Sequence, residues 1–170
     1  MVISELNLKE LMEQYDIAPM ACFDQFSISL HLGTKVCNYH FPDNYIVTYG
    51  ERITDEQVST VELADEYILH SGQAILACSS ERIKMPAGYI GFLQTKGSLA
   101  RLFVTAHCCD GQIEPGFEGH VTFEICNMGP LDVRLLPNAP LAQMFIFKTS
   151  SDQQRYQGKY NNSDKPTYSK

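Results

Sequence analysis

The chain has 170 residues, of which 44% are hydrophobic and 19% are charged, and its formal net charge is −7. This length fits one domain, residues 1–170, and the composition excludes a disordered chain, while the acidic balance argues against a nucleic-acid polymer as partner. No apolar run approaches the ~18–20 residues that cross a bilayer, and the first residues do not form a signal peptide, so we expect a cytoplasmic protein with no membrane partner.

The first predicted element is a short N-terminal helix. Ser4 is placed to cap this helix. Its loosely helical apolar face, which runs through about Tyr15, is formed by Leu6, Leu8, Leu11 and Met12. After this helix the pattern changes to one typical of strands.

Short runs of β-branched, aromatic and leucine residues alternate with glycine, proline, asparagine and aspartate through the rest of the chain. Strands are predicted at residues 26–32, 45–48, 67–69, 73–79, 89–94, 119–126, 133–136 and 141–148. One short helix is predicted at 97–103. Many short strands at this spacing indicate an all-β sandwich or barrel with little helix.

The six cysteines include no C-x-x-C pair, so we expect reduced, mostly buried thiols. His107, Cys108 and Cys109 resemble a metal cluster at first sight, but adjacent cysteines make awkward joint ligands and no second ligand pair follows. The zinc-deaminase signature, H-x-E followed by P-C-x-x-C, is absent from the sequence. Any deamination of a base is therefore predicted to proceed without zinc.

The segment Lys96-Gly-Ser-Leu-Ala-Arg101 contains the parts of a phosphate site. Gly97 permits close approach of the backbone, Ser98 offers a hydroxyl, and a helix start offers N–H donors. Lys96 and Arg101 add positive charge. The same pattern also fits a turn flanked by solvated basic residues.

A second segment runs from Gln112 through the Pro115-Gly116 turn into a strand. With a period of two, Val121, Phe123 and Ile125 share one face, and Thr122, Glu124 and Cys126 share the other. Glu124 is then either a solvated carboxylate on an exposed face or a carboxylate that a rigid strand points into a cleft.

The C-terminal segment, residues 149–170, combines basic residues with tyrosines. From Lys148 to Lys170 there are five basic residues and two acidic ones. Such a tail is either a mobile terminus or a flexible flap that closes over a small polyanion.

The order of these segments resembles the dCTP deaminase family of the dUTPase superfamily over nearly the whole chain. The matching stretches are 24–33, 67–73, Pro86, 96–101, 113–119, the strand ending at Glu124, Asn127 and 137–143. The resemblance implies a distorted jelly-roll-like β-barrel, assembled as a homotrimer with active sites between neighbouring subunits. It also implies dCTP as substrate, with Mg²⁺ bound through the triphosphate and not by protein ligands, and dUTP and ammonia as products. Residues 149–170 would close over the nucleotide.

The resemblance also assigns roles to residues. Glu124 falls on the catalytic glutamate and Arg101 on an active-site arginine. Lys96 and Ser98 fall on phosphate contacts, with Gly97 between them. The other positions expected to bind nucleotide are Asp110, Glu114, Phe117, Thr122, Phe123, Gln143, Arg155, Tyr156 and Lys159.

Three departures from the family pattern accompany this assignment. Gly97 replaces the first of two adjacent serines, a hydroxyl that helps to hold the catalytic water. Three consequences of its loss remain open: lower activity, compensation by another residue, or a relative without catalytic activity. Asp110 stands where a small residue is usual, which bears on the choice of base. The tail match Arg155-Tyr-Gln-Gly-Lys159 competes with an alignment that places Lys159-Tyr160 on the same pair.

Three functions therefore remain open from the sequence. The first is deamination of dCTP. The second is a dUTP diphosphatase or a bifunctional enzyme that continues to dUMP, although the glycine-rich dUTPase tail is missing. The third is a nucleotide-binding or regulatory relative without turnover.

Overall fold

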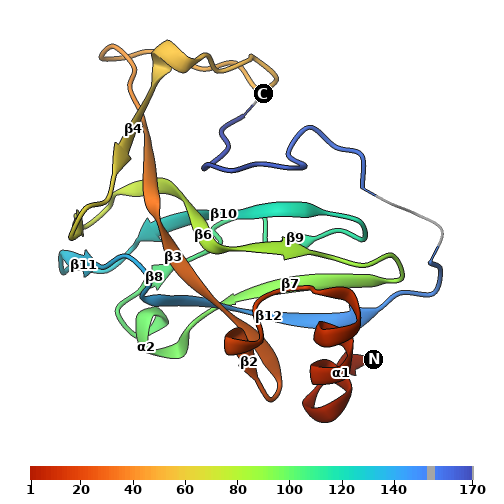
Figure 1. Ribbon diagram of the computed structural model, residues 1–170. Coiled ribbons are helices and arrows are strands. Elements are labelled where there is room, and N and C mark those ends of the chain that lie inside the picture. The colour runs from red at the N-terminus through yellow and green to blue at the C-terminus, as the bar shows by residue number, and fades with distance from the viewer. Residues whose placement is uncertain (153–155, 170) are drawn as a thin grey trace.

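The computed structural model describes residues 1–152 and 156–169, and it confirms the mostly-β prediction (Figure 1). The elements run in this order: β1 (Val2–Ile3), α1 (Glu5–Tyr15), η1 (Met20–Cys22), β2 (Phe23–Asp24), β3 (Ser27–Tyr39), η2 (Asp55–Gln57), β4 (Val58–Glu62), β5 (Tyr67–Leu69), β6 (Ala74–Lys84), β7 (Tyr89–Thr95), α2 (Gly97–Ala100), β8 (Val104–Thr105), β9 (Gln112–Ile113), β10 (Glu118–Asn127), β11 (Val133–Leu135) and β12 (Pro140–Lys148).

The strands form one curled, ten-stranded antiparallel sheet and a separate β5–β11 pair. The main path is β8-β10-β6-β3-β12-β7-β9, with β1 beside β12 and with β2 and β4 beside β3. The long strand β3 joins the two halves of the sheet, because residues 28–31 pair with β12 and later residues pair with β6 and β4.

Gly33 lies where β3 passes from one half of the sheet to the other. A Cβ atom at this position would lie 2.8 Å from the carbonyl oxygen of Cys78 and 3.2 Å from that of Ser79. Because both atoms belong to the backbone of β6, only glycine allows the two strands to approach this closely.

The N-terminal helix is confirmed over α1. Leu8, Leu11 and Met12 are buried against the sheet, whereas Leu6 is exposed and lies outside the apolar face. Ser4 occupies the N-cap position, but its side chain makes no capping hydrogen bond. Packing of the three buried side chains, at roughly 1.5–3 kcal/mol each, therefore holds this helix in place.

Strand β10 shows the predicted alternation along its whole length. Val121, Phe123 and Ile125 are buried in the core, and Thr122 and Glu124 on the opposite face are half-buried. The sequence therefore correctly separated the core face of this strand from the face that carries Glu124.

One predicted strand is absent and one predicted helix is shorter than expected. Residues 45–48 form no strand: Tyr45 donates its N–H to the carbonyl of Pro42 in a turn, and its hydroxyl donates to Glu51. The second helix is shorter than the predicted 97–103, because α2 ends at Ala100 and a turn follows, with Phe103 in the left-handed conformation.

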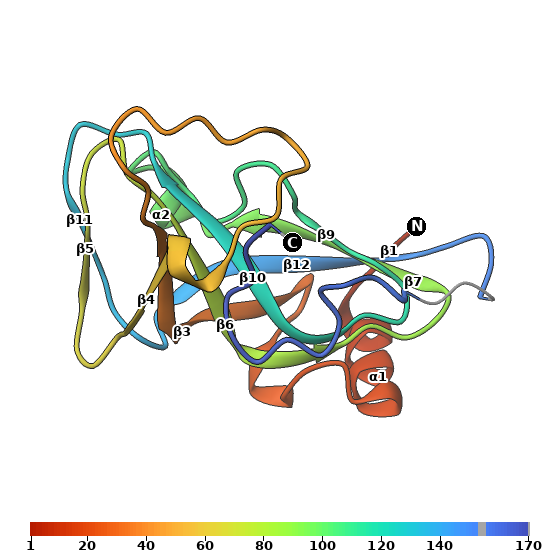
Figure 2. The ribbon, with the colours of Figure 1, turned by 90° about the horizontal axis from the view of Figure 1, so that it is seen from above.

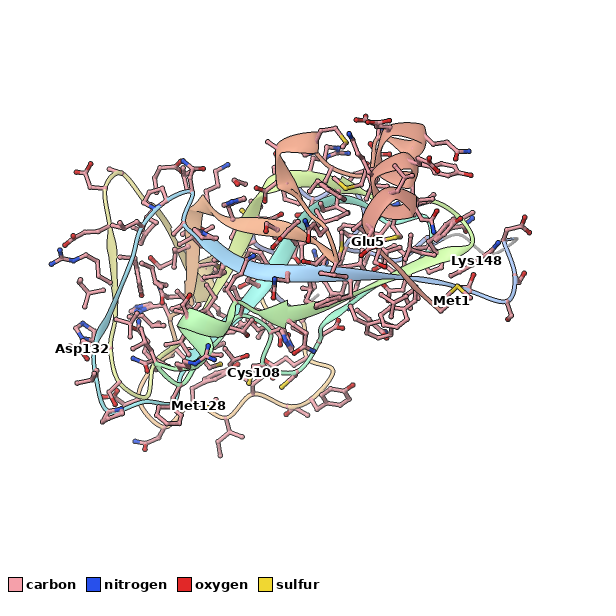
Figure 3. The ribbon with its side chains drawn as sticks, turned by 90° about the horizontal axis from the view of Figure 1, so that it is seen from below. Met1, Glu5, Cys108, Met128, Asp132 and Lys148 are labelled. Carbon is pink, nitrogen blue, oxygen red and sulfur yellow. The ribbon has the colours of Figure 1, made fainter. Side chains whose placement is uncertain are left out.

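The described part of the C-terminal tail returns across the outer face of β10 and ends beside the 40–57 loop (Figure 2). At one end of the molecule Lys148 lies beside Met1, while Asp132 lies at the opposite end (Figure 3). Within residues 1–152 and 156–169, no helix is long and apolar enough to span a membrane.

The cysteines are all free thiols, but fewer are buried than predicted. Cys22, Cys37 and Cys78 are buried and Cys126 is half-buried. Cys108 and Cys109 are exposed, because their loop lies at the edge of the sheet beside Glu124.

Candidate functional site

A cavity of about 360 Å³ lies between the outer face of β10 and the C-terminal tail. Asp110, Glu114, Phe117, Thr122 and Glu124 line it, all of which the sequence predicted as site residues. Tyr156, another predicted residue, lines it from the tail. The structure therefore brings six of the predicted residues to one cavity.

Glu124 is oriented by the loop that precedes β9. Its Oε2 atom accepts a hydrogen bond of 2.7 Å from the backbone N–H of Cys109 and one of 3.2 Å from that of Asp110. The same loop pairs with β10, since the N–H of Cys108 donates to the backbone carbonyl of Glu124 at 3.2 Å. A half-buried carboxylate on a rigid strand, held by two backbone donors, is well placed for proton transfer.

The cavity wall beside Glu124 is polar. Asp110 and Glu114 bring two further carboxylates to it, and His120 brings an imidazole. The Nδ1 atom of His120 lies 2.8 Å from the carbonyl oxygen of Ser79, which can only accept, so Nδ1 carries the proton of that hydrogen bond. The space can therefore satisfy several hydrogen-bonding groups of a ligand.

Aromatic rings form the other side of the cavity. The rings of Phe117 and Tyr156 lie 6.2 Å apart at 53°, and the Tyr156 N–H donates to the carbonyl of Pro115 at 2.6 Å. Burial raises the pKa of the Tyr156 phenol, and the negative charge of Glu114 adds to this effect. Such rings provide surface on which a planar base can stack.

Hydrogen bonds donated by backbone N–H groups hold the tail over the cavity. The His120 N–H donates to the carbonyl of Ser163 at 2.9 Å, and the Thr167 N–H donates to Thr122 Oγ1 at 3.1 Å. Gly119 makes this contact possible, because its φ is +153° and a Cβ atom there would lie 3.0 Å from the Ser163 nitrogen. The described tail therefore covers the cavity.

The predicted residues of the 96–101 segment lie in a different part of the fold. Lys96, Gly97, Ser98 and Arg101 do not line the cavity formed by the described residues. They belong to α2 and its flanks, at the far end of the sheet from the tail (Figure 1).

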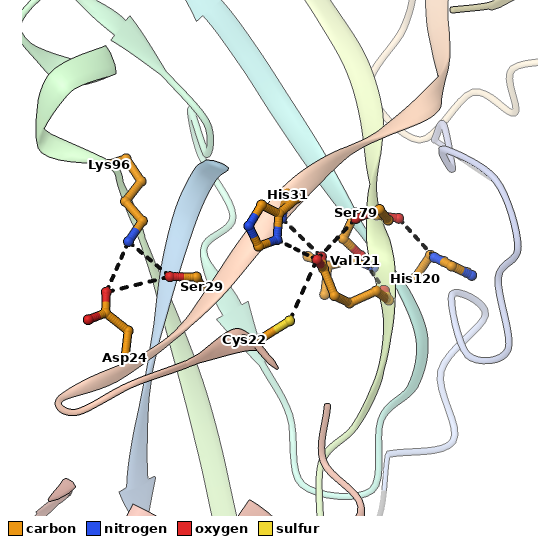
Figure 4. Close-up of polar contacts among 10 residues, drawn as sticks. Cys22, Asp24, Ser29, His31, Ser79, Lys96, His120 and Val121 are labelled. Carbon is orange, nitrogen blue, oxygen red and sulfur yellow. Dashed lines mark hydrogen bonds and ion pairs between the residues drawn. The ribbon is translucent and has the colours of Figure 1, made fainter. Parts of the chain in front are cut away.

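Lys96 forms a polar cluster with the hairpin of β2 and β3. Its Nζ atom lies 3.1 Å from Asp24 Oδ2 and 2.9 Å from Ser29 Oγ (Figure 4). The hydrogen bond from Lys96 holds the pKa of Asp24 below its usual value, and the Gln143 side chain acts in the same direction. Gln143, a predicted nucleotide contact, does not line the cavity.

Arg101 folds back over Gly97. Its Nη1 atom donates to the Gly97 carbonyl at 2.9 Å, and a Cβ atom on residue 97 would lie 2.9 Å from the same Nη1. The guanidinium group therefore occupies the space that a serine side chain would enter.

Of three other predicted residues, two do not line the cavity and one lies outside the described residues. Phe123 is fully buried on the core face of β10 and does not line the cavity. The Nζ atom of Lys159 lies 5.3 Å from the centre of the Tyr160 ring. Arg155 lies outside the described residues.

Several residues that line the cavity were not predicted from the sequence. His120 shares the face of Thr122 and Glu124, so its spacing was a usable signal. The sequence offered no such signal for Tyr39, because this residue ends a strand that was predicted to stop at residue 32. Tyr160, which the alternative alignment of the tail offered, also lines the cavity, and the unassigned side chains of the tail are those of Thr167, Tyr168 and Ser169.

Residues 2–149 match a family model described as dCTP deaminase-like. A curated relative from Natronomonas pharaonis, named dCTP deaminase, is 28% identical over 167 residues, which cover 93% of this chain and 86% of the relative. One from Corynebacterium efficiens, named dCTP deaminase, dUMP-forming, is 37% identical over 124 residues, covering 68% of this chain and 64% of the relative.

A solved structure confirms the fold. The 2'-deoxycytidine 5'-triphosphate deaminase from Agrobacterium tumefaciens superposes with a TM-score of 0.66 at 18% sequence identity. The match covers 87% of this chain and 48% of that one, so the present chain corresponds to about half of the longer protein.

Proposed function

The chain belongs to the dCTP deaminase-like family, and on this premise we propose that it hydrolyses dCTP to dUTP and ammonia without zinc. The observation that carries the proposal is the position of Glu124, a carboxylate fixed by two backbone N–H groups inside a cavity lined by polar and aromatic side chains. We place this activity in the cytoplasm.

Glu124 acts as the proton shuttle in this proposal. Its carboxylate takes a proton from water, and the resulting hydroxide adds to C4 of the cytosine ring while the proton passes to N3. The carboxylate then moves the hydroxyl proton of the tetrahedral intermediate to the amino group, which leaves as ammonia. The sum is dCTP plus water giving dUTP plus ammonia, so one carboxylate suffices.

The predicted phosphate and arginine groups are supplied by a second subunit. Lys96, Ser98 and Arg101 do not line the cavity that contains Glu124, so a complete site requires α2 of a neighbouring chain. Arg101 would hold the glutamate ionised and offset negative charge as the water attacks. The proposed assembly is a homotrimer, with Mg²⁺ bound to the triphosphate and not by protein ligands.

The replacement of serine by Gly97 fits the same proposal. Arg101 fills the space of that side chain and places its guanidinium at residue 97. We propose that this guanidinium, from the neighbouring subunit, stands in for the serine hydroxyl beside the catalytic water.

A second candidate is a bifunctional enzyme that also hydrolyses dUTP to dUMP and pyrophosphate. It is favoured by the names of several relatives, including the Corynebacterium efficiens protein and a Halobacterium salinarum protein that is 36% identical over 123 residues, both described as dUMP-forming.

Incubation with dCTP and Mg²⁺ tests these candidates directly. The products are separated by ion-exchange chromatography, and ammonia and pyrophosphate are assayed independently. Stoichiometric ammonia and dUTP are expected; dUMP and pyrophosphate would instead establish the bifunctional enzyme. Tight binding of dCTP without either product would contradict both and leave the nucleotide-binding relative.

A further inference from the structure

Three potential metal ligands from three separate segments meet on the face of the sheet beneath η1. They are Cys22 at the end of η1 and His31 in β3, both labelled in Figure 4, and Glu81 in β6. Their donor atoms all lie within 4.8 Å of one another. No step of the proposed deamination uses them, and none of them lines the cavity that contains Glu124.

The cluster is largely shielded from solvent. Cys22 is 5% exposed and Glu81 is 7% exposed, whereas the His31 side chain is 28% exposed. The imidazole therefore marks the side from which solvent and a small ion reach the two buried donors.

The carboxylate of Glu81 is held in place by neighbouring donors. The His31 backbone N–H donates to Oε2 at 2.9 Å, and the Ser80 hydroxyl donates to Oε1 at 3.0 Å. Outer contacts of this kind orient the ligands of metal sites and reduce the ordering that ion binding requires.

From this convergence we infer that Cys22, His31 and Glu81 form a binding site for a Zn²⁺-like divalent ion, with solvent as the fourth ligand. Thiolate sulfur, imidazole nitrogen and carboxylate oxygen are the donors that zinc prefers. Thiolate and carboxylate together carry two negative charges, so the filled site is neutral inside a mostly buried pocket.

The donor spacing needs only local adjustment. Zinc–ligand bonds of about 2.0–2.3 Å separate tetrahedral donors by roughly 3.3–3.8 Å. Cys22 Sγ already lies 3.7 Å from Glu81 Oε1, while His31 Nδ1 lies 2.5 Å from the same oxygen. The histidine–glutamate hydrogen bond therefore opens by about 1 Å, through side-chain rotation, when both atoms bind the ion.

Ion binding also displaces protons. Burial, assisted by the charge of Glu81, raises the pKa of the Cys22 thiol to about 11, so the sulfur is protonated at neutral pH. Formation of the Zn–S bond releases that proton to solvent, and His31 binds the ion through an Nδ1 atom that carries no proton.

The site would join the N-terminal segment to the sheet. Cys22 lies in the segment that links α1 to β2, whereas Glu81 lies in β6, the central partner of β10. An ion here would stabilise the fold without taking part in deamination, and this inference does not depend on the proposed function.

Cobalt binding to the 170-residue chain tests the site, because tetrahedral Co²⁺–thiolate centres show a near-ultraviolet charge-transfer band and intense visible bands. The Cys108→Ser/Cys109→Ser variant serves as the starting protein, so that the two exposed thiols do not contribute. After treatment with a chelator, titration should give these bands at one equivalent per chain, and Zn²⁺ should displace them and raise the melting temperature.

Added in this background, Cys22→Ser and Glu81→Gln should abolish the bands and the zinc-dependent stabilisation. Cys78→Ser is the matched control, because Cys78 is equally buried, with its thiol pKa also raised to about 11, yet lies outside the cluster. Melting in chelator shows whether each variant is folded; if Cys22→Ser is not, Cys22→Ala replaces it. Absence of the bands in the starting protein, or their persistence in folded Cys22→Ser or Cys22→Ala, would overturn the inference.

Discussion

Asp110 lies beside Glu124 in the cavity and is coupled to it through its own backbone N–H, which donates to Glu124 Oε2 at 3.2 Å. Its carboxylate can accept a hydrogen bond from the amino group of cytosine, whereas the O4 atom of uracil would be repelled by it. We therefore interpret Asp110 as a residue that favours substrate over product.

The Asp110→Asn variant tests this interpretation, because it removes the charge and leaves the backbone contact to Glu124 in place. The loss of one charge-assisted hydrogen bond should raise the KM for dCTP about tenfold, and inhibition by dUTP should strengthen. Steady-state kinetics measures both quantities, with exposed Asp65→Asn as control. An unchanged ratio of dCTP to dUTP affinity would contradict the role.

The second residue prediction concerns Gly97→Ser. The new Cβ atom would lie 2.9 Å from Arg101 Nη1, which is the end of a flexible side chain and can move at little cost. Stability should change by less than about 0.5 kcal/mol. Because the Arg101 guanidinium is proposed to stand in for the serine hydroxyl, displacing it should lower kcat roughly two- to tenfold, the effect of one hydrogen bond. A higher kcat would show that a hydroxyl at residue 97 holds the water better than Arg101 does.

At the residue scale, the alternation of residues along a single strand was sufficient to predict which face of the strand each side chain occupies. The alternation of β10 located Glu124 on the face opposite Phe123, and the structure has this arrangement. The ion pair between Lys96 and Asp24 was not predictable, because the two residues are 72 positions apart and meet only through the pairing of β3 with β12.

The elements that form the site are β10 and the tail that crosses it, and Gly119 is the point of closest approach. Gly119→Ala would strain a backbone at φ +153° and bring Cβ to 3.0 Å from the Ser163 nitrogen. We expect the tail to be displaced, with faster proteolytic cleavage within 156–169 and a KM for dCTP raised several-fold.

A matched control separates backbone strain from loss of this contact. Gly72 also has a positive φ, +79°, but a Cβ atom there would have no neighbour within 4 Å. Gly72→Ala should lower stability by about 1 kcal/mol without changing cleavage of the tail. Equal effects of the two substitutions on KM would contradict a specific role for tail docking.

Most strands were predictable as elements because their apolar runs lie between turn residues. The error at 45–48 arose because an apolar run without a partner strand can stay in a loop, as exposed Ile46 and Val47 do. Strand β4 was missed for the opposite reason, since its mixture of serine, threonine and glutamate is ordered by pairing with β3.

At the scale of the whole molecule, the predicted catalytic residues lie in two groups. Glu124 lines the cavity, whereas Arg101 lies at α2 and does not. A single sequence contains both motifs but does not show whether one chain or two bring them together. The proposed homotrimer resolves this separation by pairing the cavity of one subunit with α2 of the next.

Mixed trimers test this arrangement. Arg101→Ala and Glu124→Gln should each be inactive alone, and the two are co-expressed with different tags and purified through both. A ring of three that contains both variants has one site with an intact Glu124 and an intact Arg101, so about one third of wild-type activity should return. Mixed trimers with no activity would place both residues in the same subunit, and a monomer by light scattering would contradict the assembly itself.

The central claim, that Glu124 shuttles the protons of deamination, is tested most directly by single-turnover ammonia release from dCTP in wild type and Glu124→Gln. Glutamine keeps a carbonyl oxygen for the N–H groups of Cys109 and Asp110 but cannot take a proton. The account predicts unchanged melting, retained dCTP binding, and a rate at least about a thousandfold lower. A folded, dCTP-binding Glu124→Gln variant that releases ammonia within tenfold of the wild-type rate would contradict it.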